Sequence, residues 1–170
     1  SSTLMANLAE WATVDPFLLN EKSLGGSGYD IAVAEEKSTI LFQKINGRNK
    51  IEKVNFNSAF LDELILIHLN QKQDSREGIE LYRSKVKSEN LIKRFSSLTE
   101  SIIKSKDLEE FSSLMEVHEA ELSRFLGLET AKNKHFTDSP VFVKSLGAWG
   151  GDFVLSRKFR DYKTYFQSKN

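Results

Sequence analysis

The stretch LGGSGYDIAVAEE, residues 24–36, places three glycines around Ser27 and then sets Asp30 directly before a run of small, weakly helical residues. A plain surface turn needs one glycine and no fixed carboxylate. Glycines on both sides of Ser27 indicate that another group approaches the backbone closely there. Two readings are open for Asp30: a chemical role toward a ligand, or capping of the helix that follows.

A second glycine-rich loop, GAWGGD at residues 147–152, also ends in an aspartate. Backbone amides in such loops can form a concave nest for phosphate oxygens, and a helix N-terminus adds partial positive charge. Each loop by itself is more often a plain turn. Together with a helix that starts at Ser1-Ser2-Thr3, they make three segments able to surround one polyphosphate.

Composition narrows the functional class. Lys plus Arg and Asp plus Glu number 24 each, so no basic excess is available for a nucleic-acid backbone, and no nucleic-acid partner is expected. Cysteine is absent, which excludes disulfides and thiolate metal sites and fits a cytoplasmic protein. The longest apolar run, near LILIHL, is too short to span a bilayer, so no membrane partner is expected. Because the first residue is Ser1 and not Met, we expect the chain to be part of a longer protein.

The order of expected elements is α+β with an antiparallel sheet. Leu4, Leu8 and Trp11 have helical spacing, and Asp15-Pro16 is a cap followed by a first-turn proline. Asn46-Gly47 predicts a β-hairpin. A buried strand is expected at LILIHL, helices at 88–105 and 107–126, and strand, loop and strand over 141–157. The composition shifts after Phe56, which is the expected domain boundary.

The three histidines share no metal-ligand spacing, and no metal site is expected from them. His118 falls on the apolar seam of the 107–126 helix, where a hydrogen-bonded core histidine is expected more often than a functional one.

The two glycine loops and the serine-rich start, taken in order, resemble the GHMP kinases, the family of galactokinase, homoserine kinase, mevalonate kinase and phosphomevalonate kinase. SSTLMANLAEW is similar to the end of the family's Gly-Leu-Gly-Ser-Ser-Ala motif and the helix after it. GSGYDIA matches its Gly-Ser-Gly-x-Asp-x-Ala segment, in the GYDIA form of a bacterial subgroup. GAWGGDF resembles its C-terminal Gly-Ala-Gly-Gly-Gly loop, with Trp149 in place of the central glycine and Phe153 in place of a cysteine.

The resemblance implies a fold and a reaction. Residues 1–56 would be the end of a ribosomal-S5-like nucleotide-binding domain. Residues 57–170 would be a ferredoxin-like C-terminal domain with helices on one face of an antiparallel sheet. The implied activity is transfer of the γ-phosphate of Mg-ATP to a hydroxyl or phosphate of a small metabolite, in the style of mevalonate or phosphomevalonate kinase. Because the family's N-terminal substrate and ATP contacts lie outside these 170 residues, the piece alone is expected to be inactive. The implied partners are ATP, Mg²⁺, the acceptor and the N-terminal segment of the same protein, and a homodimer is allowed.

The resemblance also assigns residues. Asp30 would be the catalytic aspartate that accepts the substrate hydroxyl proton. The implied ATP and phosphate contacts are Ser1, Ser2, Gly147, Ala148, Gly150 and Gly151, with Ser1 and Ser2 also near Mg²⁺. The implied substrate contacts are Ser27, Gly28, Tyr29, Lys144 and Asp152.

Each assignment has a structural alternative. The serines would cap the first helix, the GAWGGD loop would be a hairpin turn, and Lys144 would be a solvated charge. At the level of the whole chain, the alternative is a non-catalytic ligand-binding or assembly module that kept the fold. The same fold serves several substrates, so the acceptor does not follow from it.

Overall fold

A computed structural model describes residues 2–56, 59–71, 75–147, 149 and 152–169. The chain divides into two compact units, Ser1–Phe56 and Asn57–Asn170, and each is described by itself. Both combine helices with antiparallel strands, so the α+β class predicted from the element order is confirmed. No helix among the described residues is long and apolar enough to cross a membrane.

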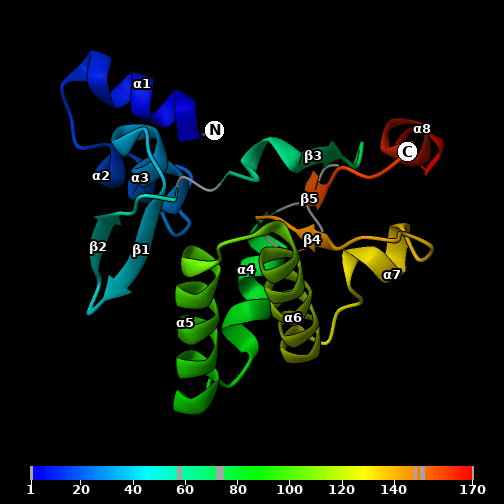
Figure 1. Cartoon of the computed structure of the whole chain (residues 1–170). Helices are drawn as coiled ribbons and strands as arrows, with labels where there is room; N and C mark the ends of the chain where they lie inside the picture. The colour runs from blue at the N-terminus through cyan, green and yellow to red at the C-terminus, as the bar shows by residue number, and fades with distance from the viewer. Residues whose placement is uncertain (1, 57–58, 72–74, 148, 150–151, 170) are drawn as a thin grey trace. The chain divides into compact units, whose positions relative to one another are not determined.

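The first unit contains three helices and one hairpin (Figure 1). The helices are α1 (Ser2–Ala12), α2 (Pro16–Lys22) and α3 (Tyr29–Glu36), and α1 packs against the other two. Asp15 caps α2 as predicted: its Oδ1 accepts the Phe17 and Leu18 amides at 2.7 and 2.9 Å. The aspartate therefore satisfies two amide donors that the first turn of a helix would leave unpaired.

The buried face of α1 differs from the expected one. Met5 and Ala9 are buried, whereas Leu4, Leu8 and Trp11 are exposed, with 85% of the Trp11 surface accessible. Helical spacing groups both sets on faces of the same helix, and it does not say which face meets a neighbour. Within this unit, Met5 and Ala9 join Ile31 and Ala32 of α3 as the buried apolar residues.

The predicted hairpin is confirmed. Strands β1 (Ile40–Ile45) and β2 (Arg48–Lys53) pair antiparallel with Ile45 opposite Arg48. Asn46 and Gly47 form the two-residue turn with φ of 49° and 79°. Asn and Gly are the residues that best accept positive φ at both turn positions, and this fixes the register locally.

The second unit is built on a three-stranded antiparallel sheet in the order β3-β5-β4. The strands are β3 (Leu64–His68), β4 (Val143–Ser145) and β5 (Phe153–Arg157), and a short 3₁₀ helix, η1 (Leu61–Glu63), precedes β3. Helices α4 (Ser75–Ser84), α5 (Glu89–Lys104), α6 (Leu108–Leu126), α7 (Ala131–His135) and α8 (Tyr162–Lys169) complete it. The expected pairing of strands around LILIHL and VFVKSL into one antiparallel sheet is thus observed, with β5 between them.

One face of this sheet is the core of the second unit. Ile67, Val143 and Val154, one from each strand, pack with Phe136 and Phe166 from the α7 end and α8. The strand predicted as buried at LILIHL is only partly so: Ile67 is buried, but Leu66 is 64% exposed. The reason is its position, because β3 is an edge strand and its alternate side chains face away from the core.

Helix α6 lies along α5 and also contacts β4 (Figure 1). Gly127 ends it with φ of 73°, as the sequence predicts. Its buried residues are Phe111, Ser112, Glu119, Leu122 and Leu126. The seam is therefore rotated from the predicted one, so that Glu119 is buried and His118 is only half-buried.

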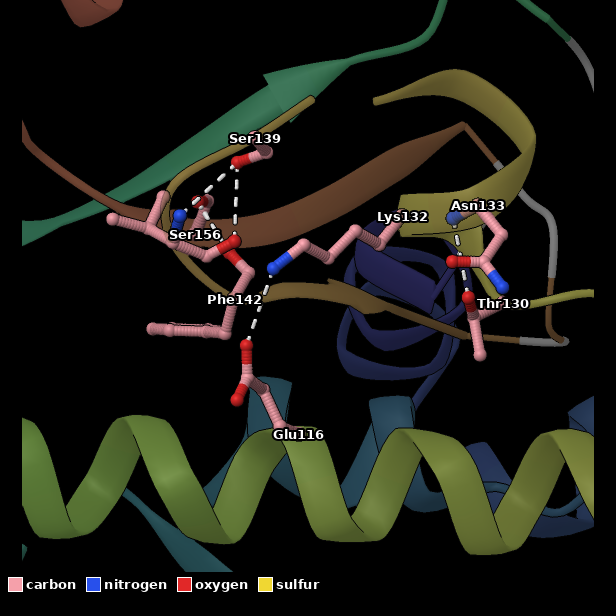
Figure 2. A network of polar contacts seen from close by, with 8 residues as sticks. Glu116, Thr130, Lys132, Asn133, Ser139, Phe142 and Ser156 are labelled. Atoms are coloured by element: carbon pink, nitrogen blue, oxygen red, sulfur yellow. Dashed lines mark hydrogen bonds and ion pairs between the residues drawn. The ribbon is translucent and has the colours of Figure 1, made fainter. Parts of the chain in front are cut away.

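Side-chain hydrogen bonds attach the segment between α6 and β4 (Figure 2). Thr130 caps α7 by accepting the Asn133 amide at 3.2 Å, and the Lys132 ammonium lies 3.3 Å from Glu116 Oε1 on α6. The fully buried Ser156 hydroxyl donates to the Phe142 carbonyl at 2.6 Å. The Lys132–Glu116 pair therefore links α7 to α6, and the Ser156 bond links β5 to the residue just before β4.

Candidate functional site

The GSGYD segment forms the start of α3 in the first unit. Gly28 is the N-cap residue, with φ of 84° and no side-chain capping bond. The φ of 84° favours glycine, and a Cβ at Gly28 would lie 3.1 Å from Cδ1 of Phe17, so the Phe17 ring would have to shift to accommodate any larger residue. The left-handed conformation of Gly28 sets the point in the first unit at which α3 begins.

Asp30 occupies the first turn of α3, two residues after the N-cap. The capping alternative for Asp30 is therefore wrong, because Gly28 holds the cap position. The exposed Asp30 carboxylate accepts only a 3.1 Å contact from the adjacent Ile31 amide among the hydrogen bonds of the described residues. Its negative charge lies at the positive end of the helix dipole, and its oxygens are open to solvent.

Ser27 and Tyr29 flank the glycine. The Ser27 hydroxyl accepts the Tyr29 amide at 3.4 Å. Burial raises the pKa of the Tyr29 phenol above its ordinary value, and the negative charge of Asp30 raises it further. Tyr29 is still about half-exposed, so its neutral hydroxyl remains able to donate a hydrogen bond to an arriving group.

The serine-rich start lies at α1. Ser2 is the first residue of this helix and is half-buried, while Ser1 lies outside the described residues. Among the described residues, no three His, Asp or Glu side chains form a group that could hold a metal ion. The magnesium role that the resemblance implies for Ser2 therefore stays a prediction.

The GAWGGD segment connects β4 to β5 in the second unit. Gly147 has φ of 62° and Trp149 has φ of 56°, so the chain turns through two left-handed residues. The Leu146 amide donates to the Phe153 carbonyl at 3.3 Å, and the Asp152 carbonyl accepts the Leu69 amide at 2.7 Å. The expectations for Ala148, Gly150 and Gly151 lie outside the described residues.

Lys144 is not the solvated lysine of the structural alternative, because it is only 8% exposed. Its ammonium lies 3.0 Å from Oε2 of Glu119 and donates to the Ser145 carbonyl at 2.7 Å. Two of the three N–H donors of the lysine thus have protein partners. Lys144, which the resemblance assigns as a substrate contact, is therefore paired with Glu119 of α6 within the second unit.

Glu119 is the centre of this buried network. Its Oε2 accepts the Ser145 amide at 3.3 Å and the Ser145 hydroxyl at 2.8 Å, and its Oε1 accepts the Ala131 amide at 3.2 Å. The carboxylate ties together α6, the start of α7 and β4. A buried carboxylate is tolerated because it is both paired and hydrogen-bonded.

His118 lies beside this network. Its Nδ1 is buried and has no hydrogen-bond partner among the described residues, contrary to the expected hydrogen-bonded core histidine. The ring contacts Phe95 edge-on, with centroids 5.1 Å apart. Burial lowers the pKa of His118, and the positive charge of Lys144 lowers it further.

A pocket of about 250 Å³ adjoins the network in the second unit. Its apolar wall includes Leu69, Leu122, Leu126 and Trp149, and its polar lining includes Glu119 and Ser145. The indole of Trp149 also stacks on Tyr82 of α4, with ring centroids 5.5 Å apart and an interplanar angle of 28°. Trp149 therefore connects the β4–β5 loop, the pocket and α4.

The predicted site residues divide between the two compact units. Ser2, Ser27, Gly28, Tyr29 and Asp30 belong to the first unit, whereas Lys144, Gly147 and Asp152 belong to the second. Glu119, Ser145 and Tyr82 were not predicted. Glu119 could have been found from spacing, because it is seven residues from both Ser112 and Leu126 and so shares their face of the helix.

No protein-family model, curated protein or solved structure matches this chain.

Proposed function

We propose that the chain is the catalytic-aspartate and C-terminal portion of an ATP-dependent small-molecule kinase of the GHMP type. The observation that carries the proposal is the state of Asp30. It stands in the first turn of a helix whose cap is a glycine that cannot be replaced without strain, and its carboxylate is exposed. Asp30 is not the N-cap residue, and its one hydrogen bond, from the Ile31 amide to Oδ1, leaves carboxylate lone pairs that can accept a proton from an acceptor hydroxyl.

In the proposed reaction, the acceptor's hydroxyl oxygen forms a bond to the γ-phosphorus of ATP as the bond to the leaving ADP oxygen breaks. Asp30 accepts the hydroxyl proton and orients the oxygen. Phosphoryl transfer depends mostly on positioning and charge neutralisation, so one placed carboxylate suffices on the nucleophile side. Mg²⁺, when bound with ATP, supplies neutralisation of the phosphate charge. Tyr29, beside Asp30, has a phenol that can hydrogen-bond the same acceptor.

In the second unit, the proposed phosphate contact is the backbone at Gly147. The phosphate role that the resemblance implies for Ser2 belongs to the first unit and stays a prediction. Gly147 has φ of 62°, and glycines in this conformation are common in loops whose backbone amides bind anions, which supports the proposal. Lys144 has a different proposed role: bound to Glu119, it supports the loop from β4 and does not itself contact the substrate.

A second function is favoured by one observation. Trp149 occupies a left-handed position and stacks on Tyr82 of α4, so a bulky indole stands where the kinase resemblance expects a glycine. A module that binds a small ligand without phosphoryl transfer would tolerate this.

The two functions are separated by assaying the full-length protein, with its N-terminal segment, with Mg-ATP and a panel of small hydroxy acids, sugars and phosphomonoesters; the 170-residue chain alone is expected to show no turnover. ADP formation is followed by coupled assay, and Asp30→Asn is measured in parallel. ADP release that depends on an acceptor and is lost in Asp30→Asn supports the kinase. Ligand binding by calorimetry without any ADP release would support the module and refute the kinase.

A further inference from the structure

We propose that the groove between strand β3 and helix α8 is a peptide-binding site, in which an extended segment of another protein pairs with the open edge of β3. The segment carries apolar side chains that enter the groove and a carboxylate that meets Lys163. The groove lies within the second unit, and the inference does not depend on the proposed kinase reaction.

The first argument is the unpaired main chain of β3, which is an edge strand with β5 on one side only (Figure 1). In an antiparallel pair, successive residues turn their amide and carbonyl alternately toward the partner strand and away from it. The Glu63 carbonyl and the Leu69 amide, at the two ends of the pair, each bond to the β5 side at 2.7 Å. Leu66 lies three residues from both, so its amide and carbonyl face the open edge, where no described residue bonds to them.

The edge also lacks the features with which sheet proteins commonly block such pairing. Leu64–His68 contains no proline, lysine or carboxylate, and Leu66 at its centre is 64% exposed. An exposed apolar edge of this kind is a template for a further strand. Addition of a peptide strand to such an edge is a recurrent mode of peptide recognition.

The second argument is a groove of about 440 Å³ beside this edge. Residues 65–68 and Asn70 form its strand wall, and Tyr162, Lys163, Phe166 and Gln167 of α8 form its helix wall. Ile67 and Phe166 belong to the core of the second unit, so the groove has an apolar base. In a strand added to β3, alternate side chains would point to the face that α8 covers. The groove therefore has space for the apolar side chains of one added strand.

The charge of the groove selects among peptides. Lys163 is exposed and has no ion-pair partner among the described residues. None of the residues that line the groove is acidic. A peptide carboxylate complements this ammonium, whereas a basic peptide would be repelled.

A second copy of the chain fits the groove less well than a free peptide does. In two paired β3 strands, each copy would turn its own Ile65 and Ile67 toward the groove face, because side chains alternate along a strand. Ile67 is already buried in its own core, and Ile65 packs against the same cluster. These side chains are therefore not available to fill the groove of a neighbour.

The experiment titrates the 170-residue chain with fluorescein-labelled peptides and follows fluorescence anisotropy. The probes are Ser-Glu-X-Thr-X-Glu-Ser, where X is valine, leucine or phenylalanine, and matched peptides with lysine in place of glutamate. The best binder is also made with N-methyl groups on alternate residues, in two sets that together cover the whole peptide. Only one set can face β3, because a strand turns alternate amides toward its neighbour. We expect saturable binding of a glutamate peptide, weaker binding of its lysine counterpart, and loss of binding with one N-methyl set but not with the other.

Two positions on the protein test the same contacts. Leu66→Pro removes the outward amide and leaves the bonds to β5, since proline is tolerated on edge strands. It should weaken binding at least about tenfold, whereas the control Leu66→Thr, which keeps the amide, should weaken it by no more than about fivefold. Lys163→Glu should weaken binding of the glutamate peptide roughly twofold to tenfold and strengthen binding of the lysine peptide. Circular dichroism establishes that each variant keeps the fold, and the N-methyl peptides need no change in the protein.

Three results would overturn the inference. If no glutamate peptide binds saturably, the groove is not a peptide site. Equal effects of the two N-methyl sets would show that binding does not use strand pairing. Self-association of the chain that Leu66→Pro abolishes, without peptide binding, would assign the edge to a second copy. Each of these results leaves the kinase proposal standing, because that proposal rests on Asp30 in the first unit.

Discussion

Replacing Lys144 by methionine tests the buried network at the centre of the second unit. The lysine and Glu119 side chains are only 10% and 7% exposed, so solvent cannot take over when the ammonium is removed. Breaking a buried ion pair from one side typically costs about 3–5 kcal/mol, because the remaining charge is uncompensated. Glu119 keeps three hydrogen bonds, from the Ala131 amide and from the amide and hydroxyl of Ser145. These bonds place the expected loss for Lys144→Met near the lower end, about 3 kcal/mol.

Removing the carboxylate of the pair, Glu119, leaves more groups without a hydrogen-bond partner than removing Lys144 does. Glu119→Leu removes the acceptor of two amides and one hydroxyl and leaves the ammonium with the Ser145 carbonyl alone. We expect it to cost more than Lys144→Met, about 4–5 kcal/mol. In the double variant no buried charge remains, so the loss should fall short of the sum by about 1–3 kcal/mol.

The assay is urea unfolding in the Trp11→Phe background, with Trp149 emission reporting on the second unit and circular dichroism on the whole chain. The free energy of unfolding is compared at equal m-values. Lys163→Met, the same change at an exposed lysine, is the matched control, and it should change the free energy of unfolding by no more than about 0.5 kcal/mol. A loss below about 1 kcal/mol for Lys144→Met, or strict additivity in the double variant, would refute the argument that this pair is buried and coupled.

Three further outcomes are expected. In the full-length enzyme, Asp30→Asn should change stability by less than about 1 kcal/mol, the worth of a first-turn charge, while kcat falls by roughly 10² to 10⁴; unchanged turnover would remove Asp30 from the mechanism. Gly28→Ala should destabilise the first unit by more than Gly25→Ala, because both have positive φ but only Gly28 has a neighbour 3.1 Å from its Cβ position, and equal melting temperatures would contradict this. His118 has a lowered pKa in the folded state, so the unfolded chain binds the proton more readily and stability should fall as pH drops below about 6.5; His118→Phe should flatten this part of the pH–stability curve, and an unchanged slope would be evidence against it.

Local features of the fold could be predicted from the sequence because neighbouring residues decide them. Asn46-Gly47 specifies a hairpin turn through its own tolerance of positive φ, and Asp15 caps α2 with a carboxylate oxygen three bonds from its own Cα. Gly127 ends α6 for the same kind of reason. None of these needs information from elsewhere in the chain.

The identity of buried faces needed the tertiary structure. Leu4 and Met5 are adjacent and both apolar, yet only Met5 is buried, because α2 and α3 pack on that side of α1. His118 and Glu119 are likewise adjacent on α6, and the polar seam position belongs to Glu119 because β4 and α7 bring it three amide and hydroxyl donors. Periodicity gives the angle between residues and leaves the direction of the neighbour open.

For the site, the sequence by itself determined the glycine-rich start of α3 and the aspartate in its first turn, since a positive-φ glycine and a short polar residue act through the backbone beside them. Only the tertiary structure decided that Asp30 is not the cap, that Lys144 is bound to Glu119 across 25 positions of chain, and that Trp149 stacks on Tyr82. The physical reason is that ion pairs and ring contacts between distant residues exist only once packing has brought the elements together and removed water from between them.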